Sequence, residues 1–191
     1  MSNPAPGDLE LVRRFVNTFD GEGPVEELDS PRALHDWLVA NDLLQDSEEI
    51  SEFDLGVTHA LREALRAVML SHHAGEELDA MVPLYLDDAA CRVGLRVRFG
   101  PDGSPRVEAH TGGIDGALGR LLAIVHESIG DGTWERMKVC PADDCQVAFF
   151  DKSRNRSAVW CDMQVCGNRA KVRGYRTRQV KAARGGAAAG A

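Results

Sequence analysis

The sequence of 191 residues has no apolar run long enough to cross a bilayer, so we expect no membrane-spanning helix. Residues 1–8 contain neither a basic residue nor the apolar stretch of a secretory signal peptide. These two absences predict a cytoplasmic protein with no membrane partner. In that reducing compartment, cysteines that lie close together in a sequence bind metals more often than they form disulfides.

The common signatures of catalysis are also missing. His126 is not followed by the second histidine that a zinc-protease helix requires, and the adjacent His72 and His73 would point in different directions on a helix. The glycines within 112–119 form neither a phosphate-binding loop nor a dinucleotide-binding motif, and no Gly-x-Ser-x-Gly nucleophile motif occurs. We therefore predict that the protein is not an enzyme.

Lysine is absent from residues 1–133, and the charge of the chain is unevenly divided. Residues 1–133 contain 10 arginines against 25 acidic residues, a balance of −15, whereas residues 134–191 contain 12 lysines and arginines against 5 acidic residues, a balance of +7. An acidic body joined to a basic segment predicts an anionic partner for that segment. The alternative is that the two parts simply attract one another.

Apolar residues at helical spacing predict helices near 9–19, 31–38, 53–72 and 114–129. Ser30 followed by Pro31 is a typical helix start. Apolar residues alternate with arginine and glycine over 93–99, which predicts a half-buried strand; a turn at 101–104 leads to a second strand through Val107 and Ala109. The predicted fold class is α+β, with a mixed helical N-terminal domain that carries a short antiparallel hairpin.

Four of the five cysteines form two pairs with the same internal spacing of four residues. A structural zinc site takes four ligands in a tetrahedron, thiolates suit this metal, and each closely spaced pair can come from one turn. We therefore predict one structural Zn²⁺ held by Cys140, Cys145, Cys161 and Cys166. Two disulfides or free core cysteines are the alternatives. Cys91 lies outside this cluster.

The segment around these cysteines resembles the CGNR zinc-finger family. The matching motifs are Cys-Pro-Ala-Asp-Asp-Cys at 140–145, the run 149–155, and Trp-Cys at 160–161 followed by the Cys-Gly-Asn-Arg tetrapeptide at 166–169 that names the family. One departure is Ala158-Val159, where members often carry a basic residue before the Trp-Cys pair. Residues 15–18, 30–38 and 61–65 more loosely resemble the ABATE domain, which precedes this finger in proteins described as stress-induced transcription regulators.

The chain is expected to have three segments, divided after the helix that ends near Asp131-Gly132 and before the Gly/Ala-rich end. They are an ABATE-like sensor or dimerisation domain at 1–133, a treble-clef-like zinc module with a C-terminal basic helix at 134–182, and a disordered Gly/Ala tail at 183–191. We expect Val165, Val172 and Tyr175 to pack the last helix onto the finger, with Trp160 and Phe149 in the finger core. Asn168 is expected to brace the start of that helix.

Basic residues surround the predicted zinc site and are candidates for DNA contact. The predicted C-terminal basic helix could enter a DNA groove, where its arginines would contact guanine edges or phosphates. The alternatives are a solvated charged face, or a face docked on acidic residues such as Glu76, Glu77, Asp87 and Asp88. The candidate DNA-contacting residues are Arg154, Arg156, Arg169, Lys171, Arg173, Arg176 and Arg178.

These observations favour a zinc-dependent transcription regulator that binds double-stranded DNA, with an N-terminal domain that senses a signal or mediates dimerisation. Asn17 and Thr18 are candidate ligand-binding residues for a small-molecule effector. The alternative is a small-ligand-binding or catalytic protein in which the zinc module is only a structural lid. RNA binding by the same finger, and whether the protein forms a homodimer, are left open by the sequence.

Overall fold

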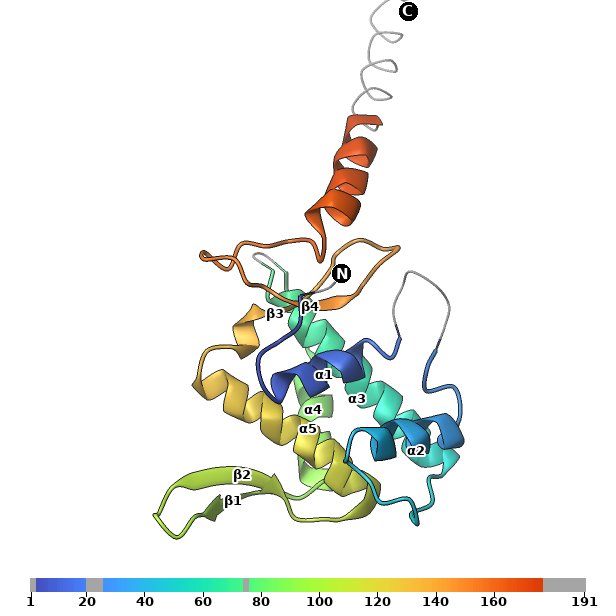
Figure 1. The fold of residues 1–191 in the computed structure, drawn as a ribbon, viewed down its shortest axis with the longest axis vertical. Coiled ribbons are helices and arrows are strands. Elements are labelled where there is room, and N and C mark those ends of the chain that lie inside the picture. The colour runs from blue at the N-terminus through green and yellow to red at the C-terminus, as the bar shows by residue number, and fades with distance from the viewer. Residues whose placement is uncertain (1–2, 20–25, 74–75, 177–191) are drawn as a thin grey trace, which may run out of the picture.

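The computed structural model describes residues 3–19, 26–73 and 76–176 (Figure 1). The predicted tail at 183–191 and the candidate DNA contact Arg178 lie outside these residues. None of the helices in the described part of the chain is both long enough and apolar enough to span a membrane.

The described helices of the body include α1 (Leu9–Val16), α2 (Pro31–Ala40), α3 (Glu52–Ser71), α4 (Met81–Arg92) and α5 (Gly113–Gly130). Local sequence explains where two of them begin. Ser30 accepts a hydrogen bond from the backbone N–H of Ala33 ahead of α2, as predicted, and Ser51 and Asp54 form a reciprocal capping box at the start of α3. The sequence did not predict α4, whose only fully buried side chain is Ala89.

The core of the molecule surrounds α3, which contacts α1, α2, α4 and the strand β3 (Met137–Val139). Burying a large apolar side chain stabilises a fold by about 1.5–3 kcal/mol, so these contacts carry most of the stability. Met137, Val139, Ala148 and Phe150 belong to the same cluster as the helices that precede them. The largest fully buried side chains include Phe15, Leu28, Leu34, Leu38, Leu61, Leu65, Met69, Leu118, Leu121 and Met137.

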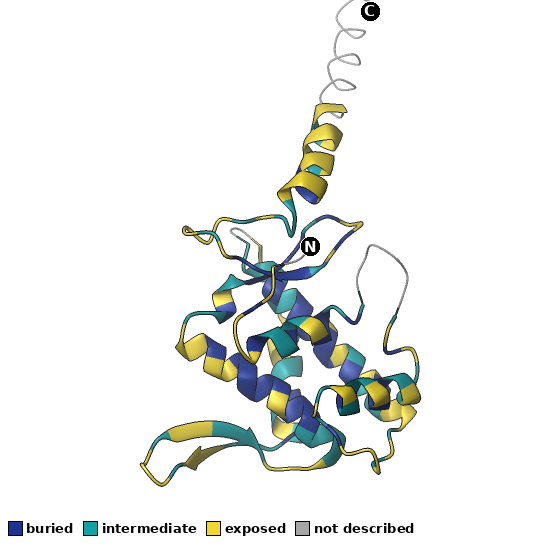
Figure 2. Ribbon diagram, viewed as in Figure 1, coloured by how far each residue is buried: buried dark blue, intermediate teal, exposed yellow. Residues whose placement is uncertain are grey.

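The predicted antiparallel hairpin consists of β1 (Leu95–Phe99) and β2 (Pro105–Ala109), paired from Leu95 with Ala109 to Phe99 with Pro105. The prediction of a half-buried face was wrong at its outer end, where Val97 and Phe99 are 57% and 71% exposed. Helix α5 packs closely on the inner end of the hairpin. Gly119 allows this approach, since a Cβ at that position would lie 2.5 Å from the side chain of Ala109. The remainder extends beyond the helices (Figure 2).

A second antiparallel hairpin pairs β3 with β4 (Ala148–Phe150), and every residue in both strands is buried. The loop between these strands holds the first cysteine pair. After the second pair, one wide helical turn at Met163–Gly167 continues as an α-helix over 168–176 and projects away from the body (Figure 1). Mixed helices, two hairpins and a cysteine-bearing module that ends in a basic helix confirm the α+β prediction.

Candidate zinc centre and basic surface

The structure brings the four predicted ligands together. The sulfur atoms of Cys140, Cys145, Cys161 and Cys166 all lie within 4.8 Å of one another. Cys161 Sγ lies 3.5 Å from Cys145 Sγ and 3.7 Å from Cys166 Sγ. A tetrahedral zinc ion with Zn–S bonds of about 2.3 Å separates its sulfurs by about 3.8 Å, whereas a disulfide requires about 2.05 Å. The geometry fits one Zn²⁺ and excludes the disulfide alternative.

The four clustered thiols strongly influence one another's pKa. A hydrogen bond with Cys161 lowers the pKa of Cys140 to about 5, and the same contact raises the pKa of Cys161 well above its usual value. Burial raises the pKa of Cys145 to about 12. Four thiols at this spacing therefore cannot all ionise unless a positive charge joins them. Zinc binds cysteine as the thiolate, so loading the site releases protons and ties the two halves of the module together.

Backbone contacts position each cysteine pair. In the first turn the N–H of Cys140 donates to the carbonyl of Val147 at 2.9 Å, and the N–H of Cys145 donates to the carbonyl of Ala142 at 2.9 Å. In the second pair, the Asp162 carboxylate accepts from the backbone N–H groups of the next turn, at 2.7 and 3.1 Å. Asp162 therefore caps the helix that carries Cys166.

The structure explains the residue type at two positions of the Cys-Gly-Asn-Arg tetrapeptide, Gly167 and Asn168. Gly167 is buried, and a Cβ there would lie 3.2 Å from Trp160 and 2.5 Å from the sulfur of Met163. Asn168 donates to the carbonyl of Gln164 at 2.9 Å and so braces the first helical turn, as predicted. Phe149 and Trp160 pack around the cysteines, which confirms their predicted place in the finger core.

A buried ion pair orders the loop between the cysteine pairs. Lys138 Nζ donates to the Asp151 carboxylate at 2.8 Å and to the carbonyls of Arg156 and Ala158 at 2.6 and 3.1 Å. Asp151 is fully buried and also accepts from the backbone N–H groups of Ser153 and Ala158. All three protons of the ammonium group are thereby used. The sequence analysis missed this pair, although a lysine in an apolar strand is the signal that could have identified it.

The basic side chains lie on the outside of the module. Arg154, Lys171 and Arg176 are exposed, and Arg156 forms an ion pair with Glu135 while its backbone adopts a left-handed conformation with φ of 51°. Arg169 and Arg173, about half exposed, both reach the carboxylate of Asp144, at 3.4 and 3.1 Å. That partner belongs to the zinc turn and not to the acidic body.

The prediction that Val165, Val172 and Tyr175 pack the last helix onto the finger was wrong. These side chains are 41%, 49% and 58% exposed, and the helix projects away from the body (Figure 1). Val165 and Val172 instead line an open groove together with the arginines of the helix and Asp144. The outer face of the helix is therefore both apolar and basic.

Asn17 and Thr18 make contacts within the protein. The Asn17 side-chain amide forms two hydrogen bonds with the backbone of Ala148 in β4. Its Nδ2 donates to the carbonyl at 2.9 Å, and its Oδ1 accepts from the N–H at 2.7 Å. Thr18 is buried, donates to the carbonyl of Phe15 and accepts from Arg62. Asn17 therefore lies at the junction between the helices and the zinc module, whereas the contacts of Thr18 lie within the helical body.

The end of α3 and the two residues that follow it fasten the zinc module to the body. His72 and His73 donate to the carbonyls of Met137 and Val139, at 2.7 and 2.6 Å, so the two adjacent rings hold alternate carbonyls of β3. Burial lowers the pKa of His72 below its usual value, which keeps that ring neutral.

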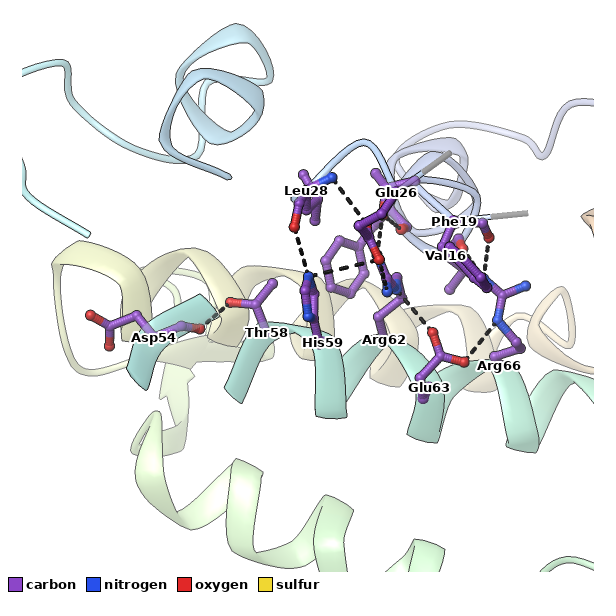
Figure 3. A network of polar contacts seen from close by, with 12 residues as sticks. Val16, Phe19, Glu26, Leu28, Asp54, Thr58, His59, Arg62, Glu63 and Arg66 are labelled. Carbon is purple, nitrogen blue, oxygen red and sulfur yellow. Dashed lines mark hydrogen bonds and ion pairs between the residues drawn. The ribbon is translucent and has the colours of Figure 1, made fainter. Parts of the chain in front are cut away.

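Helix α3 also carries a row of charged side chains that includes Arg62, Glu63 and Arg66 (Figure 3). The Arg62 guanidinium donates two hydrogen bonds to the carboxylate of Glu26, each 2.6 Å long, and a third to the carboxylate of Glu63. Glu63 in turn accepts from Arg66, which donates to the carbonyls of Val16 and Phe19 and, at 2.6 Å, to that of Gln146. Arg66 therefore joins α1, α3 and the first zinc turn.

A centre of four cysteines followed by an exposed basic helix defines a zinc-finger protein. Two family comparisons match the chain: the CGNR zinc finger over residues 136–179, and ABATE, described as "Putative stress-induced transcription regulator", over residues 9–129. The chain belongs to the ABATE family and carries a CGNR zinc finger. Both resemblances seen in the sequence are thereby confirmed. A comparison with curated proteins gave no match.

Proposed function

We propose that this protein is a zinc-dependent transcription regulator that binds double-stranded DNA through its C-terminal module and is not an enzyme. The observation that carries the proposal is the basic helix that starts at the zinc ligand Cys166 and points away from the acidic body (Figure 1). Arg169, Arg173 and Arg176 are exposed, and the ion pairs of Arg169 and Arg173 lie on one surface aspartate, Asp144. Phosphate oxygens can replace such a carboxylate directly.

The zinc and the buried ion pair have complementary roles in this proposal. The metal fixes the direction of the helix by holding Cys166 against the other three ligands. The contact between Lys138 and Asp151 holds the backbone around Arg156, so the loop with Arg154 and Arg156 is placed before DNA arrives. Residues ordered in advance lose less conformational entropy on binding, which favours affinity. The proposal assigns the DNA contacts to Arg154, Arg156, Arg169, Lys171, Arg173, Arg176 and Arg178.

The acidic body is proposed to sense a signal or to mediate dimerisation in the cytoplasm. Its fastening to the module through His72, His73, Arg66 and Asn17 supports this role, because a change at α1 or α3 would reach β3, β4 and the first zinc turn directly. The alternative of a finger that serves only as a lid predicts a basic face docked on the acidic body. The outward direction of the basic helix favours the regulator.

The test is binding of the zinc-loaded protein to a pool of random duplex DNA, followed by fluorescence anisotropy at several salt concentrations. Changing Arg169, Arg173 and Arg176 together to alanine should weaken binding and lower the salt slope by about 1 for each arginine that contacts phosphate. A matched control changes three exposed arginines of the body, Arg32, Arg98 and Arg106, to alanine. Equal effects of the two triple variants, or no binding to duplex DNA at low salt, would refute the proposal.

A further inference from the structure

A pocket of about 340 Å³ lies where α3 meets the first zinc turn. This volume falls at the lower end of the range for small-molecule sites. One wall comes from α3 through Glu63, Arg66, Ala67 and Leu70, and the opposite wall comes from the segment that holds Cys140. The pocket therefore spans the joint between the body and the module that carries the basic helix.

The lining combines an apolar interior with negative charge. Ala67, Leu70, Val139 and Pro141 supply apolar surface, whereas Glu63, Glu76 and Asp143 bring carboxylates. Arg66 is the basic residue among the described residues of the lining, and its guanidinium is directed to Glu63 and to three backbone carbonyls, so its charge is already matched inside the protein. Glu63 is also engaged by Arg62 and Arg66, so the net negative charge that the pocket presents comes from the exposed carboxylates of Glu76 and Asp143.

We infer that this pocket binds a small organic cation, an amine or amidine attached to an apolar group. The apolar group would pack between Leu70 and Pro141, and the cationic group would face the carboxylates of Glu76 and Asp143. A neutral analogue would gain the apolar contact alone, and an anionic analogue would be repelled. Opposite charges at short range in a partly enclosed site favour the cation.

The position of the pocket gives the ligand a route to the basic helix. The carbonyl of Gln146, held by Arg66, follows directly after the zinc ligand Cys145, and Gln146 adopts a left-handed conformation with φ of 53°. A molecule wedged between α3 and this turn would alter the angle between the body and the zinc centre. This regulatory consequence rests on the proposed DNA binding, whereas cation binding itself does not.

The experiment measures binding of three probes that share one apolar group to the full-length, zinc-loaded protein by calorimetry. The probes are 2-phenylethylamine, the neutral 2-phenylethanol and the anionic 3-phenylpropionate. The amine should bind in the millimolar range or better and at least about tenfold more tightly than the other two. Removing two carboxylates with Glu76→Gln and Asp143→Asn should weaken amine binding about tenfold and leave binding of the alcohol unchanged.

A second variant, Ala67→Phe, fills the pocket from α3 and should weaken all amine binding, with unchanged zinc content as the check on folding. The inference is wrong if the three probes bind alike, if none binds in the millimolar range, or if Ala67→Phe binds the amine as well as the parent protein does. Anisotropy with duplex DNA separates the two proposals. Amine binding by a protein that never binds DNA would support the pocket and refute the proposed function.

Discussion

The two hairpins in the described residues, β1–β2 and β3–β4, are both antiparallel pairs of strands, but their surroundings are opposite. In β1 and β2, apolar residues alternate with charged ones over five-residue strands, yet Val97 and Phe99 reach solvent. In β3 and β4, each strand has three residues and one of the central residues is a lysine, yet every position is buried. The difference shows that neighbouring elements, and not the pattern within a strand, decide burial. Among the described elements, α5 makes the main contact with the first hairpin, whereas α1, α3 and the zinc turn hold the second.

Metal removal should have the largest effect, because structural zinc sites contribute folding free energy of about 10 kcal/mol or more in small fingers. Chelation, or Cys166→Ser, should abolish hydrogen-exchange protection over 140–147 and 160–176. The hairpin of β1 and β2 should keep its protection, because it has no contact with the metal centre. Loss of protection in β1 and β2 to the same extent as in 140–147 and 160–176 would contradict this prediction.

Replacing the buried lysine should come next. Lys138→Met leaves the fully buried carboxylate of Asp151 without its cation, and losing one partner of a buried pair costs about 3–5 kcal/mol. The matched change in the first hairpin is Arg98→Met, whose exposed pair with Glu108 is worth about 0–1 kcal/mol. Urea unfolding of both variants measures the two losses in unfolding free energy. Similar losses would contradict the comparison.

The same pair predicts a dependence of stability on acid. Burial alone would raise the pKa of Asp151, but bonds from Lys138, Ser153 and Ala158 outweigh it and hold that pKa below the usual value of 3.8. A carboxyl with a lower pKa in the folded protein stabilises it above the unfolded pKa and loses this effect as the pH falls through the folded value. The gap in unfolding free energy between the parent protein and Asp151→Asn should therefore narrow below about pH 4. A constant gap would disprove the assignment.

The smallest effect is expected at the exposed aspartate of the zinc turn. Asp144→Asn removes the acceptor shared by Arg169 and Arg173, and exposed ion pairs contribute little to stability, so the melting temperature should stay unchanged. Affinity for duplex DNA should rise about twofold to fivefold, because the two arginines no longer have to give up an ion pair with Asp144 before they bind phosphate. Asp143→Asn is the control for the loss of one charge from the same turn. Weaker DNA binding by Asp144→Asn would contradict a DNA role for these arginines.

The sequence predicted those features that local pattern determines. The spacing of the cysteines identified the metal site, and Ser30 with Pro31 placed the start of α2. It failed where a partner from elsewhere in the chain decides the outcome. Val97 and Val172 look like core residues, but both are about half exposed, because none of the elements in the described residues covers them. Lys138 looks like a surface residue, but Asp151 and two carbonyls surround its charge.

The two histidines show the same limit at the junction. Both rings bond to carbonyls more than sixty residues away in the chain, and nothing near the histidines in the sequence indicates these partners. Helix α4 escaped prediction for a related reason. Most of its side chains are not buried, so its sequence carries no clear apolar stripe.

The shared core around Met137, Val139 and Phe150 limits how this protein can be cut and recombined. A fragment that ends at residue 133 would leave the apolar faces of α1 and α3 uncovered, and one that begins at residue 134 would expose the buried hairpin. The two pieces should therefore be poorly soluble apart and should reassociate when mixed. Exchange of a complete zinc finger between relatives would then succeed only if the residues of α1 and α3 that hold β3 and β4 travel with it.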